Sequence, residues 1–249
     1  MTDIADILKG FEPISLSEME SVKLMNRIDT KFAINIRQLP AILTKAQEAY
    51  FAQEIDGKRI ATYDTMYYDT DDCDMYMRHH NRQLVRQKVR IRKYVESQLT
   101  FLEVKRKNNK GRTKKKRLAI RDERLEESAM SEFVAAKSRY HWEQLSPHLR
   151  TTFRRITLVN KAKTERLTID MNLRWSNVVT GSETGFDDLV IIELKRDGNV
   201  SSPMIGILNE ERVHPLKISK YCIGTALTNP AIKQNRFKGK IQRIKKLLL

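Results

Sequence analysis

The chain has 249 residues, of which 40% are hydrophobic, and its formal net charge is +16. This length allows one large domain or two small ones, and the positive field attracts polyanions such as nucleic acid, anionic lipid or phosphorylated small molecules. The two cysteines, Cys73 and Cys222, are too few for a disulfide framework and too far apart for a zinc site. No signal peptide and no run of about 18 apolar residues is present, so we expect a cytoplasmic protein without a transmembrane segment.

The first third of the chain predicts helices that alternate with short strands. Pro40 is tolerated in the first turn of a helix, and Asp56-Gly57 is a strong turn signal between two apolar runs. We therefore expect, in chain order, a helix over residues 15–27, a strand over 30–34, a helix over 38–50, a hairpin of strands 51–55 and 59–68, and a helix over 70–81.

The rest of the chain predicts mainly hairpins. Short turns join three successive strands in the middle of the sequence, and Ser202-Pro203 is typical of a helix cap followed by the first helical residue. The expected strands cover residues 88–96, 99–106, 114–120, 152–159, 166–175 and 187–196, with the last hairpin turn at 181–185. The expected helices cover residues 122–149, 204–211 and 219–227.

About eight strands joined mostly by hairpins imply antiparallel pairing. Eight antiparallel strands can close into a barrel whose lumen holds one small ligand. The predicted fold class is therefore α+β, with a closed antiparallel eight-stranded β-barrel and flanking helices. We expect a single domain over residues 1–249 with its core at about 20–227. The basic tail at 238–249 is either a frayed helix or a weak surface anchor.

Three predicted strands alternate charged and apolar residues with a period of two. Because a strand sends successive side chains to opposite faces, Arg90 and Arg92 share one face, as do Glu103 with Lys105 and Glu193 with Lys195. Strands this apolar are expected to turn their charges into an enclosed, mostly cationic interior. Further candidates for that interior are Lys31, Arg155, Arg166, Thr168 and Asp170, together with either Lys115 and Arg117 or Lys114 and Lys116.

An excess of Arg and Lys in a low-dielectric interior is repulsive unless an anion fills it. Arginine binds phosphate bidentately and lysine adds a point charge. A few carboxylates among these cations suggest a divalent metal, since hard cations take carboxylate and phosphate oxygens. The set suits phosphoryl transfer even without a glycine-rich loop, because that chemistry depends mainly on positioning and charge neutralisation.

Eight short motifs occur in one order along the chain, and together they resemble the VTC domain. This is the polyphosphate polymerase branch of the triphosphate tunnel metalloenzymes, and the resemblance covers about residues 20–227. The motifs are Arg27-Ile-Asp-Thr-Lys31-Phe32, Tyr68-Asp69-Thr70, Arg90-Ile-Arg92-Lys-Tyr94, Glu103-Val-Lys105, Phe153-Arg-Arg155, Arg166-Leu-Thr-Ile-Asp170, Glu193-Leu-Lys195 and Lys217-Ile-Ser219-Lys220-Tyr221.

The resemblance implies transfer of the γ-phosphate of ATP onto polyphosphate, with Mn²⁺ or Mg²⁺ as cofactor. Glu193 is implied as the metal ligand, and Glu103 is a second candidate. Phe153 stands where the family often has a tyrosine, which removes one hydrogen bond. The membrane-spanning and regulatory segments of the family are not found here, and a membrane-protein partner is left open. The catalytic candidates are Lys31, Arg90, Arg92, Lys105, Arg155 and Lys220, and the further phosphate-binding candidates are Lys115, Arg117, Arg166, Lys195, Lys217 and Ser219.

Several alternatives remain open from the residues alone. Glu103, Glu193 and Asp170 can each be a cross-strand partner of a cation, and Ser219 can be a helix cap. A tunnel of this kind can also hydrolyse triphosphate or nucleoside triphosphates, or only bind a polyanion. Nucleic acid is disfavoured because aromatic residues do not interleave with the basic ones and no nucleic-acid motif is present.

Overall fold

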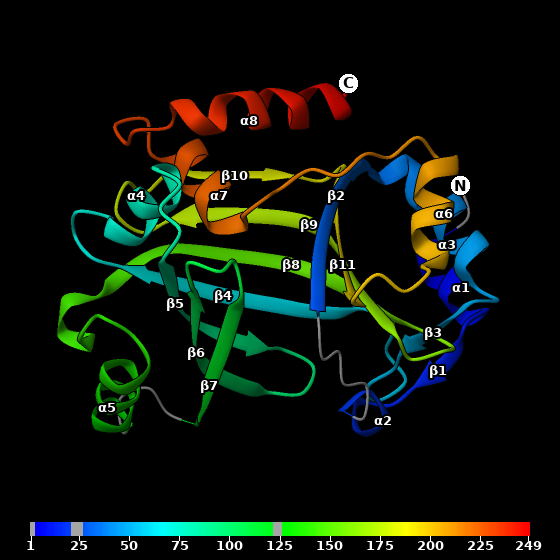
Figure 1. Ribbon diagram of the computed structural model, residues 1–249, viewed down its shortest axis with the longest axis horizontal. Coiled ribbons are helices and arrows are strands. Elements are labelled where there is room, and N and C mark those ends of the chain that lie inside the picture. The colour runs from blue at the N-terminus through cyan, green and yellow to red at the C-terminus, as the bar shows by residue number, and fades with distance from the viewer. Residues whose placement is uncertain (1–2, 21–26, 122–125) are drawn as a thin grey trace.

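The computed structural model describes residues 3–20, 27–121 and 126–249, in which helices cover both faces of one curled β-sheet (Figure 1). Its strands are β1 (Glu12–Ile14), β2 (Arg27–Asn35), β3 (Tyr50–Gln53), β4 (Ala61–Asp69), β5 (Arg86–Tyr94), β6 (Leu99–Lys107), β7 (Thr113–Ile120), β8 (Ser146–Asn160), β9 (Glu165–Asn177), β10 (Glu183–Phe186) and β11 (Leu189–Asp197). Its α-helices are α1 (Ile4–Lys9), α2 (Leu16–Glu20), α3 (Leu39–Ala46), α4 (Asp74–His80), α5 (Glu127–Lys137), α6 (Pro203–Glu210), α7 (Lys220–Thr228) and α8 (Asn235–Leu247). Two 3₁₀ turns, η1 (Ile36–Gln38) and η2 (Trp142–Gln144), complete the elements.

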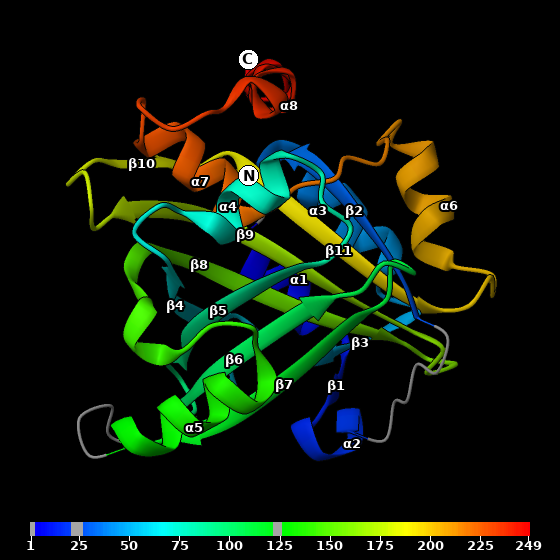
Figure 2. The same ribbon diagram turned by 60° about the vertical axis from the view of Figure 1, so that its left-hand side comes forward.

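The main path of the sheet has the order β2-β11-β9-β8-β4-β5-β6-β7, with every neighbouring pair antiparallel. The expected α+β class is confirmed, as is antiparallel pairing along this path, although β1 and β3 pair in parallel beside it; the expected closure is wrong. In the described ranges β2 and β7 do not pair, so the sheet is a half-barrel (Figure 2).

Another segment of the chain lies along the edge of β2 that does not pair with β11. Phe32 bridges Pro215, and the Leu216 amide donates to the carbonyl of Lys31 at 2.7 Å. The same segment then crosses to β5, where Ser219 Oγ lies 2.7 Å from Lys88 Nζ. Residues 215–219 thus contact both β2 and β5 on the two sides of the curl. The other edge, β7, carries four successive cations at 114–117, and charged edge strands resist further pairing.

The outer face of the sheet buries the apolar half of the alternating strands. Ile192 and Leu194 of β11 pack in one cluster with residues of α1, α3 and α6. Val89 and Leu102, on β5 and β6, pack in another cluster with residues of α5. This burial fixes the register, since a slip of one residue would place charges in these cores.

The inner face, the side of the sheet that carries Arg90, Arg155 and Glu193, is covered at one end by α7. Trp175 of β9 is buried in the same cluster as Tyr221 and Cys222 of α7, and its indole N–H donates to the carbonyl of Lys220 at 3.0 Å. Gly224 allows this close packing, because a Cβ added there would lie 2.1 Å from Trp175 Cδ1. Helix α8 lies beyond α7 on the same side (Figures 1 and 2).

Several predicted elements are confirmed. The hairpins β5-β6 and β6-β7 form in the expected places. Ser202 caps α6 and Ser219 caps α7. Residues 21–26 and 122–125, at which two predicted helices end and begin, lie outside the described part of the chain.

Three predicted elements are wrong. The last hairpin turn was expected at residues 181–185, but Glu183–Phe186 form strand β10 and pair with β9. The turn at Asp56-Gly57 is present, with both residues at positive φ, but the strands beside it do not form a hairpin. Instead β3 and β4 both pair with the 15-residue strand β8, which is long enough to receive each in turn. The helix expected to reach residue 149 ends at Lys137, and β8 begins at Ser146.

The predicted tail forms the helix α8. Phe237, Ile241 and Ile244 are buried against the domain, and this apolar stripe follows helical spacing. Among the described residues, no helix combines the length and apolar character needed to cross a membrane. A surface-anchor role for the tail stays a prediction.

Candidate functional site

Strand register places the predicted charges together on the inner face. Arg90 lies opposite Glu103, which in turn lies opposite Arg117 on β7. Lys88, Lys105 and Lys115 form the next row of the same three strands. The register left open by the sequence is therefore settled in favour of Lys115 and Arg117.

The first cluster is built around the fully buried carboxylate of Glu103. One oxygen accepts from Arg90 Nε at 2.7 Å and Nη2 at 2.5 Å. The other accepts from Lys115 Nζ at 2.8 Å. Burial raises the pKa of Glu103, but the charges of Arg90, Arg92 and Lys115 outweigh it and hold that pKa far below its usual range.

The second cluster is built around Asp170, whose side chain is 1% exposed. Arg155 donates to both oxygens, at 2.5 and 2.8 Å, and Lys220 of α7 donates to one of them. Burial and the nearby charge of Arg155 lower the pKa of Lys220 to about 8. The charge of Asp170 offsets this lowering only in part. The Lys220 ammonium also lies 4.5 Å from the centre of the Phe153 ring.

The third cluster surrounds Glu193 of β11. Its carboxylate lies 3.0 Å from Lys195 Nζ and 3.5 Å from Lys31 Nζ, and it remains 22% exposed. Burial raises the pKa of Glu193, but Lys31, Lys195 and the more distant Lys105 bring it well below its usual range. Lys105 belongs to β6, near the opposite end of the strand order, so the curl of the sheet brings the two halves into electrostatic contact.

Three predicted cations that are at least partly buried have no carboxylate partner among the described residues. Arg92 donates to Thr65 Oγ1 at 3.0 Å and stacks near Tyr63 and Phe153. The side chains of Lys105 and Arg166 have no hydrogen bond or ion pair within the described ranges. The pKa of Lys105 is well below its ordinary value because the charge of Arg90 and burial both disfavour its proton. Unpaired cations in this setting are poised for an anion.

Lys217 and Ser219 lie differently from the other predicted residues. Lys217 is exposed, so its phosphate role stays a prediction. Ser219 accepts from the Cys222 amide at 3.3 Å, which makes it the cap of α7, and its hydroxyl also bonds to Lys88.

Lys88 and Tyr67 are among the inner-face residues that were not predicted from the sequence. Lys88 has the same strand parity as Arg90 and Arg92, and that parity was sufficient to find it. Tyr67 Oη accepts from Arg90 Nη1 at 3.2 Å. Burial raises the pKa of Tyr67, but Arg90, Arg92, Lys88 and Lys220 together lower it to about 8. No sequence signal marked Tyr67, because only the fold surrounds it with cations.

Of the three carboxylates, that of Glu193 has the surroundings that best fit a divalent cation. Both oxygens of Glu103 and of Asp170 accept hydrogen bonds from cations, whereas Glu193 is partly exposed. Thr168, opposite Glu193, buries a hydroxyl that has no hydrogen-bond partner among the described residues. No three acidic, His or Cys side chains of the described chain gather to hold a metal by themselves. Mg²⁺ is commonly held by one or two carboxylates with phosphate oxygens and water.

The VTC domain family matches residues 26–229, which is most of the chain. The chain belongs to the VTC-domain family. The resemblance carried by the eight motifs is thereby confirmed.

Similar solved structures are distant. The PH1819 protein of Pyrococcus horikoshii OT3 is 13% identical, with a TM-score of 0.47 and coverage of 80% of this chain and 98% of that one. A candidate adenylate cyclase of Vibrio parahaemolyticus is 8% identical, with a TM-score of 0.49 and coverage of 81% and 99%. The candidate adenylyl cyclase HpAC1 of Hippeastrum, for which a dominant triphosphatase activity is stated, is 14% identical, with a TM-score of 0.45 and coverage of 81% and 96%. No curated protein matches the chain.

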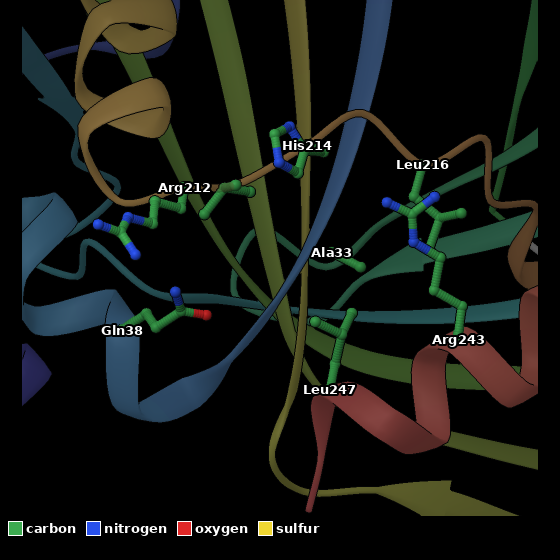
Figure 3. Close-up of a pocket in the computed structure, with 8 residues that line it drawn as sticks. Ala33, Gln38, Arg212, His214, Leu216, Arg243 and Leu247 are labelled. Atoms are coloured by element: carbon green, nitrogen blue, oxygen red, sulfur yellow. The ribbon is translucent and has the colours of Figure 1, made fainter.

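The VTC domain of this chain also has a small cavity apart from the charged clusters. It has a volume of about 90 Å³ and lies between β2, residues 212–216 and α8. Figure 3 shows Arg212 and Gln38 on one side of it and Arg243 and Leu216 on the other. None of the predicted site residues lines it, so it belongs to the cover of the inner face and not to the candidate site.

Proposed function

We propose that the protein is a polyphosphate polymerase that transfers the γ-phosphate of ATP to the terminal phosphate of a growing polyphosphate chain. Membership of the VTC-domain family supports a function on polyphosphate or triphosphate. The observation that carries the proposal is the excess of inner-face cations, since Arg92, Lys105 and Arg166 lack carboxylate partners in the described chain. A linear polyphosphate is the kind of ligand that supplies many charges along one line.

The chemistry needs no nucleophile from the protein. An oxygen of the terminal acceptor phosphate attacks the γ-phosphorus in line, a new P–O bond forms, and the bond from that phosphorus to the β-phosphate oxygen breaks as ADP leaves. The attacking oxygen is already an anion, so no base has to remove a proton. The proposed role of Arg92, Arg155 and Lys220 is to hold the transferring group and neutralise its charge.

The other predicted phosphate-binding residues extend this site in the proposal. Lys31, Arg90 and Lys105 are assigned to the transferring phosphates, and the outer members hold phosphates of the chain on either side. Those outer members are Lys115, Arg117, Arg166, Lys195, Lys217 and Ser219.

Glu193 is the proposed protein ligand of Mn²⁺ or Mg²⁺, and the ion, when bound, neutralises charge on the phosphate oxygens. Glu193→Gln is expected to lower turnover at least tenfold while triphosphate binding stays equal or improves, because a negative charge is removed from a cationic site. Equal turnover in the variant would contradict the assignment.

The polymerase test is incubation with ATP and Mn²⁺ or Mg²⁺, followed by separation of the products on a gel. We expect chains longer than triphosphate from the wild type, none from Arg92→Gln, and wild-type products from the control Lys93→Gln. Lys93 is the exposed neighbour on the same strand. Release of free phosphate alone would assign the protein as a hydrolase, and triphosphate binding without turnover would assign it as a binding module.

A further inference from the structure

We propose that the inner face carries a nucleobase site formed by Tyr94 and Phe101 beside the phosphate-binding cations. The inference rests on the proposed function and specifies its donor as a nucleoside triphosphate that is held at both the base and the phosphates. It also assigns a function to aromatic residues that sequence reasoning did not connect with the basic ones.

The aromatic residues form a continuous row across four strands. Phe153 of β8 stacks on Tyr63 of β4 with ring centres 5.2 Å apart. Tyr63 meets Tyr94 of β5 at 4.9 Å, and Tyr94 meets Phe101 of β6 edge-to-face at 5.8 Å. Register places all four on the inner face, since Tyr63 lies opposite both Phe153 and Tyr94, and Phe101 lies opposite Arg92.

The two halves of this row differ in accessibility. Phe153 and Tyr63 are 2% and 7% exposed, so neighbouring side chains cover almost all of their surface. Tyr94 and Phe101 are only partly buried. The row therefore begins beneath the phosphate-binding cations and ends in two rings that solvent, and hence a ligand, can reach.

Arginine side chains lie beside the rings of this row. The guanidinium carbon of Arg155 lies 4.6 Å from the centre of the Tyr63 ring, and that of Arg92 lies 5.4 Å from it. The guanidinium carbon of Arg117 lies 4.7 Å from the centre of the Phe101 ring. Rings interleaved with cations are the arrangement by which proteins hold single nucleotides, because the bases stack while the phosphates meet positive charge.

A stacking site of this kind is expected to recognise that a base is present but not which base it is. Every base has a π-face, so recognition by stacking tolerates different bases. We therefore expect ATP and GTP to bind alike, and inorganic triphosphate to use only the cations.

The test compares the dissociation constants of ATP, GTP and inorganic triphosphate in Mg²⁺ buffer. Phe101→Leu and Tyr94→Leu are each expected to weaken ATP and GTP by about 5- to 100-fold, while triphosphate binding changes less than twofold. Phe186→Leu, a partly buried ring on β10 away from the row, is the matched control and should change none of the three. Arg117→Gln should weaken all three ligands equally, which separates loss of charge from loss of stacking.

Phe101→Trp covers the case in which the leucine variants do not fold. Its indole fluorescence, read against the unmutated Trp142 and Trp175 background, should change with ATP and not with triphosphate. Equal effects of the leucine substitutions on ATP and triphosphate, or no effect on either, would overturn the base site while leaving the proposed function standing. Wild-type protein that binds neither ligand would overturn both.

Discussion

Two ion clusters of the inner face have the same composition and a different construction. Each joins one buried carboxylate to one arginine and one lysine: Arg90, Glu103 and Lys115 in the first, and Arg155, Asp170 and Lys220 in the second. The first comes from three neighbouring strands joined by short turns. The second takes its lysine from a helix 50 residues beyond the carboxylate.

This difference in construction produces a difference in environment. The Lys115 side chain is 40% exposed, whereas that of Lys220 is 13% exposed and lies over the Phe153 ring. A hairpin places its lysine at the open rim of the curl, while α7 brings its lysine into the interior. Substitutions in the second cluster are therefore expected to change both the free energy of unfolding and phosphate binding more than substitutions in the first.

The largest expected effect is that of Asp170→Asn. It leaves Arg155 and Lys220 buried without a carboxylate, and removing one partner of a buried pair costs about 3–5 kcal/mol. Urea denaturation should report a loss of this size in the free energy of unfolding. A loss below about 1 kcal/mol would mean that water reaches both cations.

Glu103→Gln is expected to destabilise the protein less, by roughly 1–3 kcal/mol. The reason is that Lys115 regains hydration at the rim and only Arg90 stays buried without its partner. The same urea titration measures it, and a loss larger than that of Asp170→Asn would reverse the ranking of the two clusters.

The two lysines are also expected to differ in their contribution to triphosphate binding, with the larger contribution from Lys220. Lys220→Met is expected to raise the dissociation constant for triphosphate about tenfold, because a buried charge-assisted hydrogen bond is lost. Lys115→Met should raise it by less than about threefold, since an exposed charge is screened. Isothermal titration of both variants tests the contrast, and equal effects would refute it.

The smallest expected effect is a dependence of binding on pH. Lys220 loses its proton and Tyr67 gains a negative charge as the pH rises through about 8. Both changes reduce the positive charge of the site, so triphosphate affinity should fall by a few-fold between pH 7 and pH 9. Lys220→Met and Tyr67→Phe should each flatten the profile, and a profile unchanged in both would exclude these two groups as its source.

Much of the site was predictable because it depends on local geometry. The period of two along β5, β6 and β11 placed Arg90, Glu103 and Glu193 on the inner face, and the hairpin turns made the first two neighbours. The residues of the second cluster were also named as candidates. Their pairing was not predictable, because nothing in the sequence sets how α7 packs on β9.

The errors in the fold have a common origin in long-range pairing. Asp56-Gly57 forms the turn that its residues favour, yet the strands beside it pair with β8. The sheet is open because β2 and β7 do not pair in the described chain; Pro215 and Leu216 bond to β2 instead, and a proline-containing loop carries no strand signal. The row from Phe153 to Phe101 was likewise invisible, since its four rings come from separate strands.

By itself the sequence determined which charged side chains of β5, β6 and β11 share a face, since alternation is a property of the extended backbone, and it determined the large net positive charge of the chain. Only the tertiary structure decided which carboxylate meets which cation, which cations stay unpaired, and which rings line the site. Those outcomes depend on register and packing between segments far apart in the chain, and these are set by the burial of whole faces and not by any local pattern.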